Sequence, residues 1–551
     1  MLHSLLCRCP SGQRDHQVVW RRVRRSLAVG FAAFAVAQSA PASEPPGVSD
    51  VLREIDDRSL EPLPSPDLLP TPGEPGIAEP GGPVVVVDDL VLLGNTAIET
   101  DVLRALLADA LGEAFDLAGL EGLAARLTRF YREQGYPFAQ AVLPAQDLSD
   151  GVVEFAIVEG RYGVIRAEGP EQLTRRVDPF LRALEPGGLI TSAPLERATL
   201  LLDDQPGVDI VPVMQPGELP GTGDLLLRVS PQPRRWTAQL GVDNHGSRSS
   251  GRQRLDVLLG AGSLLRFGDQ AQLRLLASEQ DLRVAQLGYQ QPLGGQGWRL
   301  DTSLAYTEYS LDLDGFSGEA RTAGVVLSYP LVRSQRSNLI ASLGITHKRL
   351  DDERLVLSER RTVTSAPFGL RFDHRDALAG GGISFGNVEL SPGRSRTDLP
   401  EFFVSGDFVQ LNARLGRLQA LTGQYSASVS LDLLWSDTDP GSSEALGIAG
   451  PAAVRGYASG EASGPRAGVS QFELQRQLPG GQAFGFFDHG RVQRFEGSDA
   501  RTLSAAGLGV RLQRGWLDVE AVTAWPLDST DAEVEPRDGP RSWLRVRARL
   551  R

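Results

Sequence analysis

The C-terminal stretch "WLRVRARLR", residues 543–551, alternates strictly between apolar and cationic side chains after its first residue. In an extended strand, successive side chains point to opposite faces. The apolar face carries Leu544, Val546, Ala548 and Leu550, and the opposite face carries Arg545, Arg547, Arg549 and Arg551. A soluble β-sandwich also alternates. Four arginines in register on one face favour a strand whose inner side lines a wide, water-filled lumen.

The same alternation extends over the whole region that follows Arg235. It is clear in "SASVSLDLLW" (426–435) and in "VQLNARL" (409–415), and helical periodicity is absent from this region. Sixteen such segments centre near residues 240, 256, 274, 286, 303, 326, 342, 368, 386, 412, 430, 472, 487, 507, 520 and 546. Strands of about 10 residues suffice to cross a bilayer. The sequence therefore predicts a 16-stranded antiparallel transmembrane β-barrel over residues 235–551.

The connections between these segments differ in length according to their position. Those after even-numbered strands are tight, as in "PLGGQG" and "LPGGQ". Long ones follow most odd-numbered strands, at residues 309–320, 348–361, 390–405, 437–466 and 526–541. Short turns on one side and long loops on the other are typical of outer-membrane barrels. The first strand therefore rises from the periplasm, and residues 437–466 form the sixth and longest outer loop.

The N-terminus has the pattern of a secretory signal peptide, predicted over residues 1–42. A cationic "RRVRR" (21–25) precedes an apolar run, 27–37, and small residues follow. Ala40-Pro41-Ala42 is a cleavage site of the usual kind, and Ala37-Gln38-Ser39 is a second candidate. A short buried helix is the alternative interpretation of the apolar run.

Composition excludes several classes of protein. Both cysteines, Cys7 and Cys9, precede the apolar run, so the processed chain is expected to contain no disulfide and no thiolate. The net charge of −13 disfavours nucleic-acid binding, which needs a basic surface. Export without cysteine fits a protein of the bacterial cell envelope.

Between the signal and the barrel lie a linker and two similar units. Residues 49–60 have the periodicity of a short helix, and the proline-rich residues 61–83 read as an extended linker. Residues 84–159 then predict the order β-α-α-β-β, with Thr100 and Asp116 as helix N-caps. Residues 160–234 repeat this order, which indicates an array of two modules.

Catalysis has little support in the sequence. After the signal only four histidines remain, His245, His347, His374 and His489, and they are scattered along the barrel. "FDHRD" (372–376) falls at a predicted short periplasmic turn, where a solvated charge cluster is the favoured interpretation. The sequence contains no nucleotide-binding loop, no G-x-S-x-G and no H-E-x-x-H. We therefore expect no enzyme activity, no catalytic residues, no cofactor and no metal.

Three motifs show a resemblance to a known family. They are "GYPFAQAVLPAQDLSDGVVEFAIVEG" (135–160), "VRGY" (454–457) in the sixth outer loop, and "FFDHG" (486–490) on the thirteenth strand. Together with the element order, they resemble the two-partner secretion (type Vb) outer-membrane transporters of the ShlB/FhaC/HecB kind. That family lies within the wider superfamily of barrels with POTRA domains. The resemblance covers nearly the whole mature chain and implies two periplasmic POTRA domains, at 84–159 and 160–234.

The resemblance implies a loop that folds back into the barrel. Its tip is expected to pair Arg455 with Asp488 on the inner wall, where the planar guanidinium fork matches a carboxylate. The motif residues expected to support this pair are Val454, Gly456, Tyr457, Phe486 and Gly490. By strand alternation, Phe487 and His489 are expected on the outer face.

The resemblance also implies partners and a direction of transport. The partner is a large secreted protein similar to filamentous haemagglutinin or haemolysin, captured by the POTRA domains and exported unfolded. Helix 49–60 is expected to plug the resting lumen, with a mobile amphipathic tail as the alternative. Outer-membrane lipid surrounds the barrel, and the barrel-assembly machinery and periplasmic chaperones are expected to assist biogenesis. The chain ends in Leu550-Arg551, whereas outer-membrane barrels often end in an aromatic residue.

Two other functions fit parts of this pattern. A barrel-assembly factor of the same superfamily usually carries more or different POTRA units. A passive porin lacks such periplasmic modules altogether. The two modules and the "LPAQDL" ending therefore favour secretion.

Overall fold

The computed structural model describes residues 62–64, 66, 79–232, 235–311, 316–354, 357–401, 403–494, 498–527 and 539–550. All of them belong to one compact unit, Pro45–Arg551. The predicted signal peptide (1–42), helix 49–60 and most of linker 61–83 lie outside the described residues. Within the described ranges, no helix is both long enough and apolar enough to cross a membrane.

The first module is a three-stranded sheet with two helices packed against it. The strands lie in the order β2-β5-β4, with β2 parallel to β5 and β4 antiparallel to it. The elements are β1 (Val85–Val86), β2 (Asp89–Leu93), α3 (Thr100–Leu106), η1 (Ala108–Ala110), β3 (Ala114–Phe115), α4 (Leu117–Glu133), β4 (Gln140–Val142) and β5 (Val152–Val158). Tyr131 and Leu127 of α4 and Phe155 of β5 are fully buried in its core.

The two predicted helix caps of this module have different outcomes. Asp116 is confirmed as the N-cap of α4, because its carboxylate accepts a hydrogen bond from the Gly119 amide at 2.8 Å. Thr100 is wrong as a cap, because it is already helical and Glu99 precedes α3; among the described residues no side chain caps this helix. The short α3 is held instead by Leu103, which is fully buried.

The second module repeats the first. Its sheet has the order β6-β8-β7, with β6 parallel and β7 antiparallel to the central strand. The elements are β6 (Arg161–Glu168), α5 (Glu171–Leu181), α6 (Ser192–Asp203), β7 (Val208–Pro216) and β8 (Thr222–Pro231). Leu195 and Leu202 of α6 pack on Val177 and Leu227 in a separate core. The predicted order of elements is therefore present in both modules.

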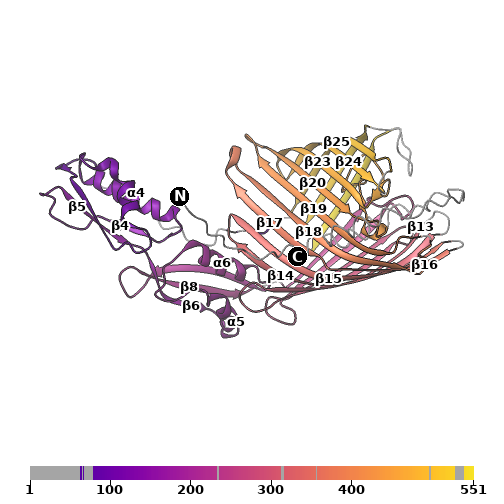
Figure 1. Ribbon diagram of the computed structural model, residues 1–551, viewed down its shortest axis with the longest axis horizontal. Helices are drawn as coiled ribbons and strands as arrows, with labels where there is room; N and C mark the ends of the chain where they lie inside the picture. The colour runs from indigo at the N-terminus through magenta and orange to yellow at the C-terminus, as the bar shows by residue number, and fades with distance from the viewer. Residues whose placement is uncertain are drawn as a thin grey trace, which may run out of the picture. The chain divides into compact units, whose positions relative to one another are not determined.

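The remaining described residues form a closed antiparallel barrel, in which the last strand pairs with the first. Its strands run side by side at a common tilt (Figure 1). They are β9 (Trp236–Asp243), β10 (Arg254–Gly262), β11 (Gln270–Ser278), β12 (Arg283–Pro292), β13 (Arg299–Leu311), β14 (Phe316–Arg333), β15 (Ser337–Arg354), β16 (Leu357–Ser365), β17 (Phe368–Asp376), β18 (Gly382–Thr397), β19 (Gly406–Ala420), β20 (Tyr425–Ser436), β23 (Arg466–Leu478), β24 (Gly481–Gln493), β25 (Arg501–Arg514), β26 (Leu517–Pro526) and β27 (Arg541–Leu550).

The predicted fold class is confirmed. β16 and β17 both lie between β15 and β18, one above the other, so they form a single barrel strand interrupted at Ala366-Pro367. In the described part of the chain the barrel therefore has sixteen strands. Each of the sixteen predicted centres falls within one of them.

The predicted outer loops need correction on one side of the barrel. Residues 309–320, 348–361 and 390–405 were expected as loops, yet most of them continue the strands. Strands β14 and β15 each have 18 residues, well beyond the expected length of about 10. Beyond the bilayer both faces of a hairpin contact water, so a sequence such as "THKRLDDER" (346–354) loses its apolar face and resembles a loop.

The charge cluster at residues 372–376 also differs from its prediction. It lies within β17 rather than in a turn. Asp373 is buried and accepts a hydrogen bond from Asn338 at 2.9 Å, and Asp376 pairs with Arg417. The wall of the barrel thus supplies partners that make these charges structural.

Candidate functional site

The sixth outer loop, between β20 and β23, folds into the barrel. It contains η3 (Ser442–Glu444), β21 (Leu446–Gly447) and β22 (Ser463–Gly464), and the last two pair with each other. Residues 453–458 at its tip are all buried. A polar, glycine-rich segment of this length is ordered here because the inner wall covers it.

Arg455 at the loop tip binds Asp488 on β24, as the motifs predict. Its Nε and Nη2 donate to the two carboxylate oxygens at 2.8 and 2.7 Å, and its backbone amide donates at 3.1 Å. Asp488 is fully buried and Arg455 is 4% exposed. A buried ion pair is stable only when each charge keeps its partner, so this contact fixes the loop tip on the wall.

A second carboxylate completes the surroundings of Arg455. Its Nη1 donates to Glu473 on β23 at 2.6 Å. Glu473 also accepts from Arg511 on β25 at 2.9 Å, and Arg511 donates to Glu520 on β26 at 2.8 Å. The loop cation is therefore one member of a charge network that extends over four neighbouring strands.

Aromatic rings cover the same guanidinium groups. The Arg455 guanidinium carbon lies 3.6 Å from the centre of the Phe486 ring, and that of Arg511 lies 4.0 Å from the centre of Phe484. A cation over a ring face is attracted by the ring quadrupole, and this attraction grows as water is excluded. Phe486 thus supports the pair by direct contact with the cation.

The backbone of the tip is held by close contact and one further hydrogen bond. The Trp543 indole N–H of β27 donates to the Arg455 carbonyl at 2.8 Å. A Cβ at Gly456 would lie 2.8 Å from the Cβ of Ala505 and 3.0 Å from the nitrogen of Pro526. Gly456 was expected to support the pair. Its contact distances show that a side chain there would collide with β25 and the end of β26.

Val454 and Tyr457 belong to a buried apolar cluster next to the ion pair. Val454 is fully buried and Tyr457 is 2% exposed. A Cβ at Gly490 would lie 2.9 Å from a methyl group of Val454, so the glycine makes room for the loop. Phe487 is half exposed on the outer face, as alternation predicts, and His489 shares a hydrogen bond with the Ser504 hydroxyl at 3.0 Å.

The sequence did not predict three residues of the site: Glu473, Arg511 and Trp543. Alternation along "SQFELQ" (470–475) does place Glu473 on the inner face together with Gln471. Which inner residues the loop tip reaches depends on the three-dimensional path of the loop, and no spacing encodes that path.

Beside the docked loop lies a polar cavity of about 960 Å³. It is bounded by the loop and by the opposite wall, which includes β10 to β13, β19 and β20. Inner-face charges here are paired across strands, as in Arg254–Asp243 at 2.8 Å, Arg274–Asp256 at 3.1 Å and Arg414–Asp432 at 3.2 Å. The loop therefore occupies one side of the lumen.

In the first module, Glu159 joins the end of β5 to the loop before α3. It accepts from the amides of Thr96 and Ala97 at 2.6 and 2.7 Å, and from the Tyr131 hydroxyl at 3.1 Å. Burial pushes the pKa of Glu159 upward, but these hydrogen bonds and one from the Thr96 hydroxyl outweigh it, so the pKa lies below its ordinary value. The carboxylate is a structural element of this module.

A closed barrel with an inward-folded loop, preceded by two βααββ modules, defines an outer-membrane transporter of the POTRA-barrel class, with its modules in the periplasm. Comparison with known families agrees. The description "Haemolysin secretion/activation protein ShlB/FhaC/HecB" matches residues 221–512, and "POTRA domain, ShlB-type" matches residues 85–160. The chain belongs to this family of two-partner secretion transporters.

Individual relatives are distant in sequence but match most of the chain's length. The chain is 25% identical to the heme/hemopexin transporter protein HuxB of Haemophilus influenzae, over 93% of this chain and 96% of that protein. It is 25% identical to the outer membrane transporter CdiB of Escherichia coli, over 74% and 72%. The solved structure of CdiB from Escherichia coli covers 91% of this chain and 95% of that one, with 21% identity and a TM-score of 0.67, which shows the shared fold.

Proposed function

We propose that this transporter captures a large exoprotein of the haemolysin or adhesin type in the periplasm and passes it unfolded through the barrel. The family description supports a secreted partner of this type. The observation that carries the proposal is the sixth loop, which Arg455 holds against Asp488 inside a closed barrel. A cavity of about 960 Å³ lies beside this loop, and a transport pathway requires such space.

Strand addition to a POTRA sheet is the proposed mode of capture. Each module has two edge strands, whose unpaired backbone groups can bind an extended peptide. In the second module the edge strand β7 contains Pro212 and Pro216, which cannot donate backbone hydrogen bonds. The start of the other edge strand, β6, is already paired with the segment before α6 through a bridge between Arg161 and Leu189. Edge strand β2 of the first module contains no proline. We therefore assign capture to the first sheet.

Cysteine cross-linking tests this assignment in the full chain, since the only native cysteines precede the predicted signal cleavage site. Leu93→Cys at the end of β2 and Val211→Cys on β7 are both exposed positions. With single cysteines along the N-terminal domain of the exoprotein, Leu93→Cys is expected to cross-link and Val211→Cys is the matched control. Cross-linking only at Val211 would refute the assignment.

Removal of residues 84–159 tests the broader proposal. The truncated chain is expected to insert in the outer membrane but to lose the exoprotein in a pull-down from periplasmic extract. Unchanged binding after this deletion would exclude the first module as the receptor. Insertion is monitored by the heat-dependent shift of folded barrels in SDS gels, so loss of binding is distinguished from loss of folding.

A further inference from the structure

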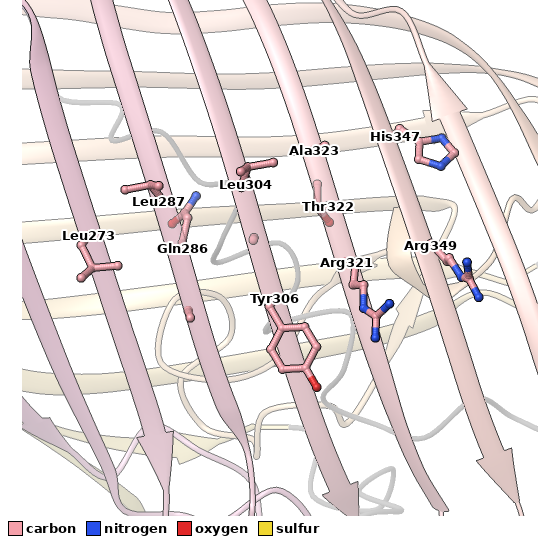
Figure 2. Close-up of a pocket in the computed structure, with 12 residues that line it drawn as sticks. Leu273, Gln286, Leu287, Leu304, Tyr306, Arg321, Thr322, Ala323, His347 and Arg349 are labelled. Atoms are coloured by element: carbon pink, nitrogen blue, oxygen red, sulfur yellow. The ribbon is translucent and has the colours of Figure 1, made fainter.

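The outer wall of the barrel carries a row of basic and aromatic side chains on β13, β14 and β15. Tyr306, Arg321 and Arg349 are direct cross-strand neighbours. Figure 2 shows them side by side on the near face of three adjacent strands. The Arg321 guanidinium carbon lies 5.9 Å from the centre of the Tyr306 ring. Both arginine side chains remain accessible, at 59% and 43% exposed.

The next row toward the periplasm is apolar on its first three strands. It contains Leu287, Leu304 and Ala323, again as cross-strand neighbours. Leu287 and Leu304 are 50% and 59% exposed. Together with Leu273 they line an open depression of about 540 Å³ that ends at Tyr306 and the two arginines. This surface therefore changes from apolar to cationic within a single step along the strands.

The position of this step lies close to the height expected for the outer edge of the bilayer. Tyr329 lies near the periplasmic end of β14, and its ring lies 4.6 Å from that of Trp298, as in an interfacial aromatic girdle. Arg321 lies eight positions before Tyr329. At about 3.3 Å per residue and a tilt of about 40°, this corresponds to roughly 20 Å of height. The apolar band of such barrels is about 25 Å tall.

The next row away from the periplasm contains carboxylates that form ion pairs with arginines. Glu319 accepts from Arg321 at 2.8 Å, and Asp351 accepts from Arg349 at 3.0 Å and from Arg360 at 2.7 Å. These carboxylates orient the two guanidinium groups from above. Each guanidinium has five N–H donors, so its ion pair with Glu319 or Asp351 engages one side of it and the fork keeps donors for a further anion.

We propose that Arg321 and Arg349, with Tyr306, bind the phosphate groups of the phosphorylated glycolipid that forms the outer leaflet of the outer membrane. The acyl chains of that lipid would lie in the depression against Leu287 and Leu304, and the phosphates would meet the arginines directly above. Two adjacent guanidinium groups suit a lipid phosphate, because phosphate oxygens accept bidentate contacts from a guanidinium fork. The site fixes the height of the long β13–β15 hairpins in the membrane.

Titration of the purified full chain with lipid A tests the site, with bound lipid counted by native mass spectrometry. The bis-phosphorylated lipid is expected to bind the wild type at least about tenfold more tightly than its dephosphorylated form, since each basic residue near a lipid surface contributes about 1 kcal/mol. Inorganic phosphate alone and phosphatidylglycerol serve as the other two arms, and both are expected to compete poorly. Equal binding of the dephosphorylated lipid, or equal competition by phosphatidylglycerol, would overturn the proposal.

A double variant locates the binding. Arg321→Gln/Arg349→Gln is expected to weaken binding of the bis-phosphorylated lipid by about 10- to 30-fold. The matched control is Arg283→Gln/Arg394→Gln, which removes the same charge at two exposed arginines that do not line the depression and should change binding less than about threefold. Equal losses in the two double variants would show attraction by net charge alone and refute the site. The comparison of the two lipids on the wild type remains decisive if a variant folds poorly.

Discussion

Asp488 accepts three hydrogen bonds from Arg455, one from its backbone amide and two from its guanidinium, and the carboxylate is fully buried. The loop tip therefore carries both a charge and a backbone donor to the same wall residue. If the Asp488 side chain rotated away, both the backbone amide and the guanidinium of Arg455 would lose their acceptor.

Removal of either charge is expected to release the loop while the barrel still inserts. Breaking a buried ion pair costs about 3–5 kcal/mol, because one charge stays buried without its partner. Arg455→Ala and Asp488→Ala should therefore sharply reduce the amount of exoprotein in the culture medium. Arg491→Ala, at an exposed position on the same strand, is the matched control. Wild-type secretion by both variants of the pair would disprove a role in transport.

Glu473 is expected to act jointly with Asp488, because Arg455 contacts both carboxylates. Glu473→Gln and Asp488→Asn should be non-additive in the free energy of barrel unfolding, with a coupling of about 0.5–3 kcal/mol. The free energy of unfolding of the wild type, the two single variants and the double variant is measured by urea titration, with the folded fraction followed by its heat-dependent mobility in SDS gels. Strict additivity would show that the two acids do not share the cation.

Gly456→Ala is expected to lift the loop tip from the wall. The added Cβ would overlap Ala505 and the backbone of Pro526, and overpacking of this kind costs about 1–3 kcal/mol. The predicted readout is a higher mean conductance of single channels in planar bilayers. Gly539→Ala provides the control, since a Cβ there meets nothing within 4 Å. Identical conductance of the two variants would contradict the close approach.

Glu159→Gln is expected to weaken the first module at neutral pH. The side-chain NH2 group of the new glutamine would face the backbone N–H groups of Thr96 and Ala97, so donor would meet donor. A buried unsatisfied polar group costs about 1–3 kcal/mol. Because the folded-state pKa of Glu159 lies below its ordinary value, its stabilisation is present above the unfolded pKa and is lost as the pH falls through the folded pKa. Limited proteolysis of this module in the full chain, from pH 7 to pH 3, should therefore show a wild-type acid sensitivity that the variant lacks. Glu113→Gln, which is exposed, should behave as wild type.

The sequence predicts the barrel well because the alternation has a direct physical cause. Within the membrane one face of each strand meets lipid and the other meets water. The apolar Val429 therefore indicates the outer face of its strand, and the polar Ser430 indicates the inner face. The same rule fails for β14 and β15 beyond the bilayer, where both faces meet water. The partner of Arg455 was identifiable because two motifs mark it. Glu473 and Trp543 carry no such mark, and only the path of the folded loop brings them to the tip.

The polar cavity beside the docked loop has a consequence for any polypeptide that crosses it. Its wall presents charges already matched as Arg254–Asp243, Arg274–Asp256 and Arg414–Asp432. A satisfied pair attracts a passing side chain of either sign only weakly. If the exoprotein takes the proposed route, these paired charges would hold its side chains only weakly, so a long and varied sequence could move past them.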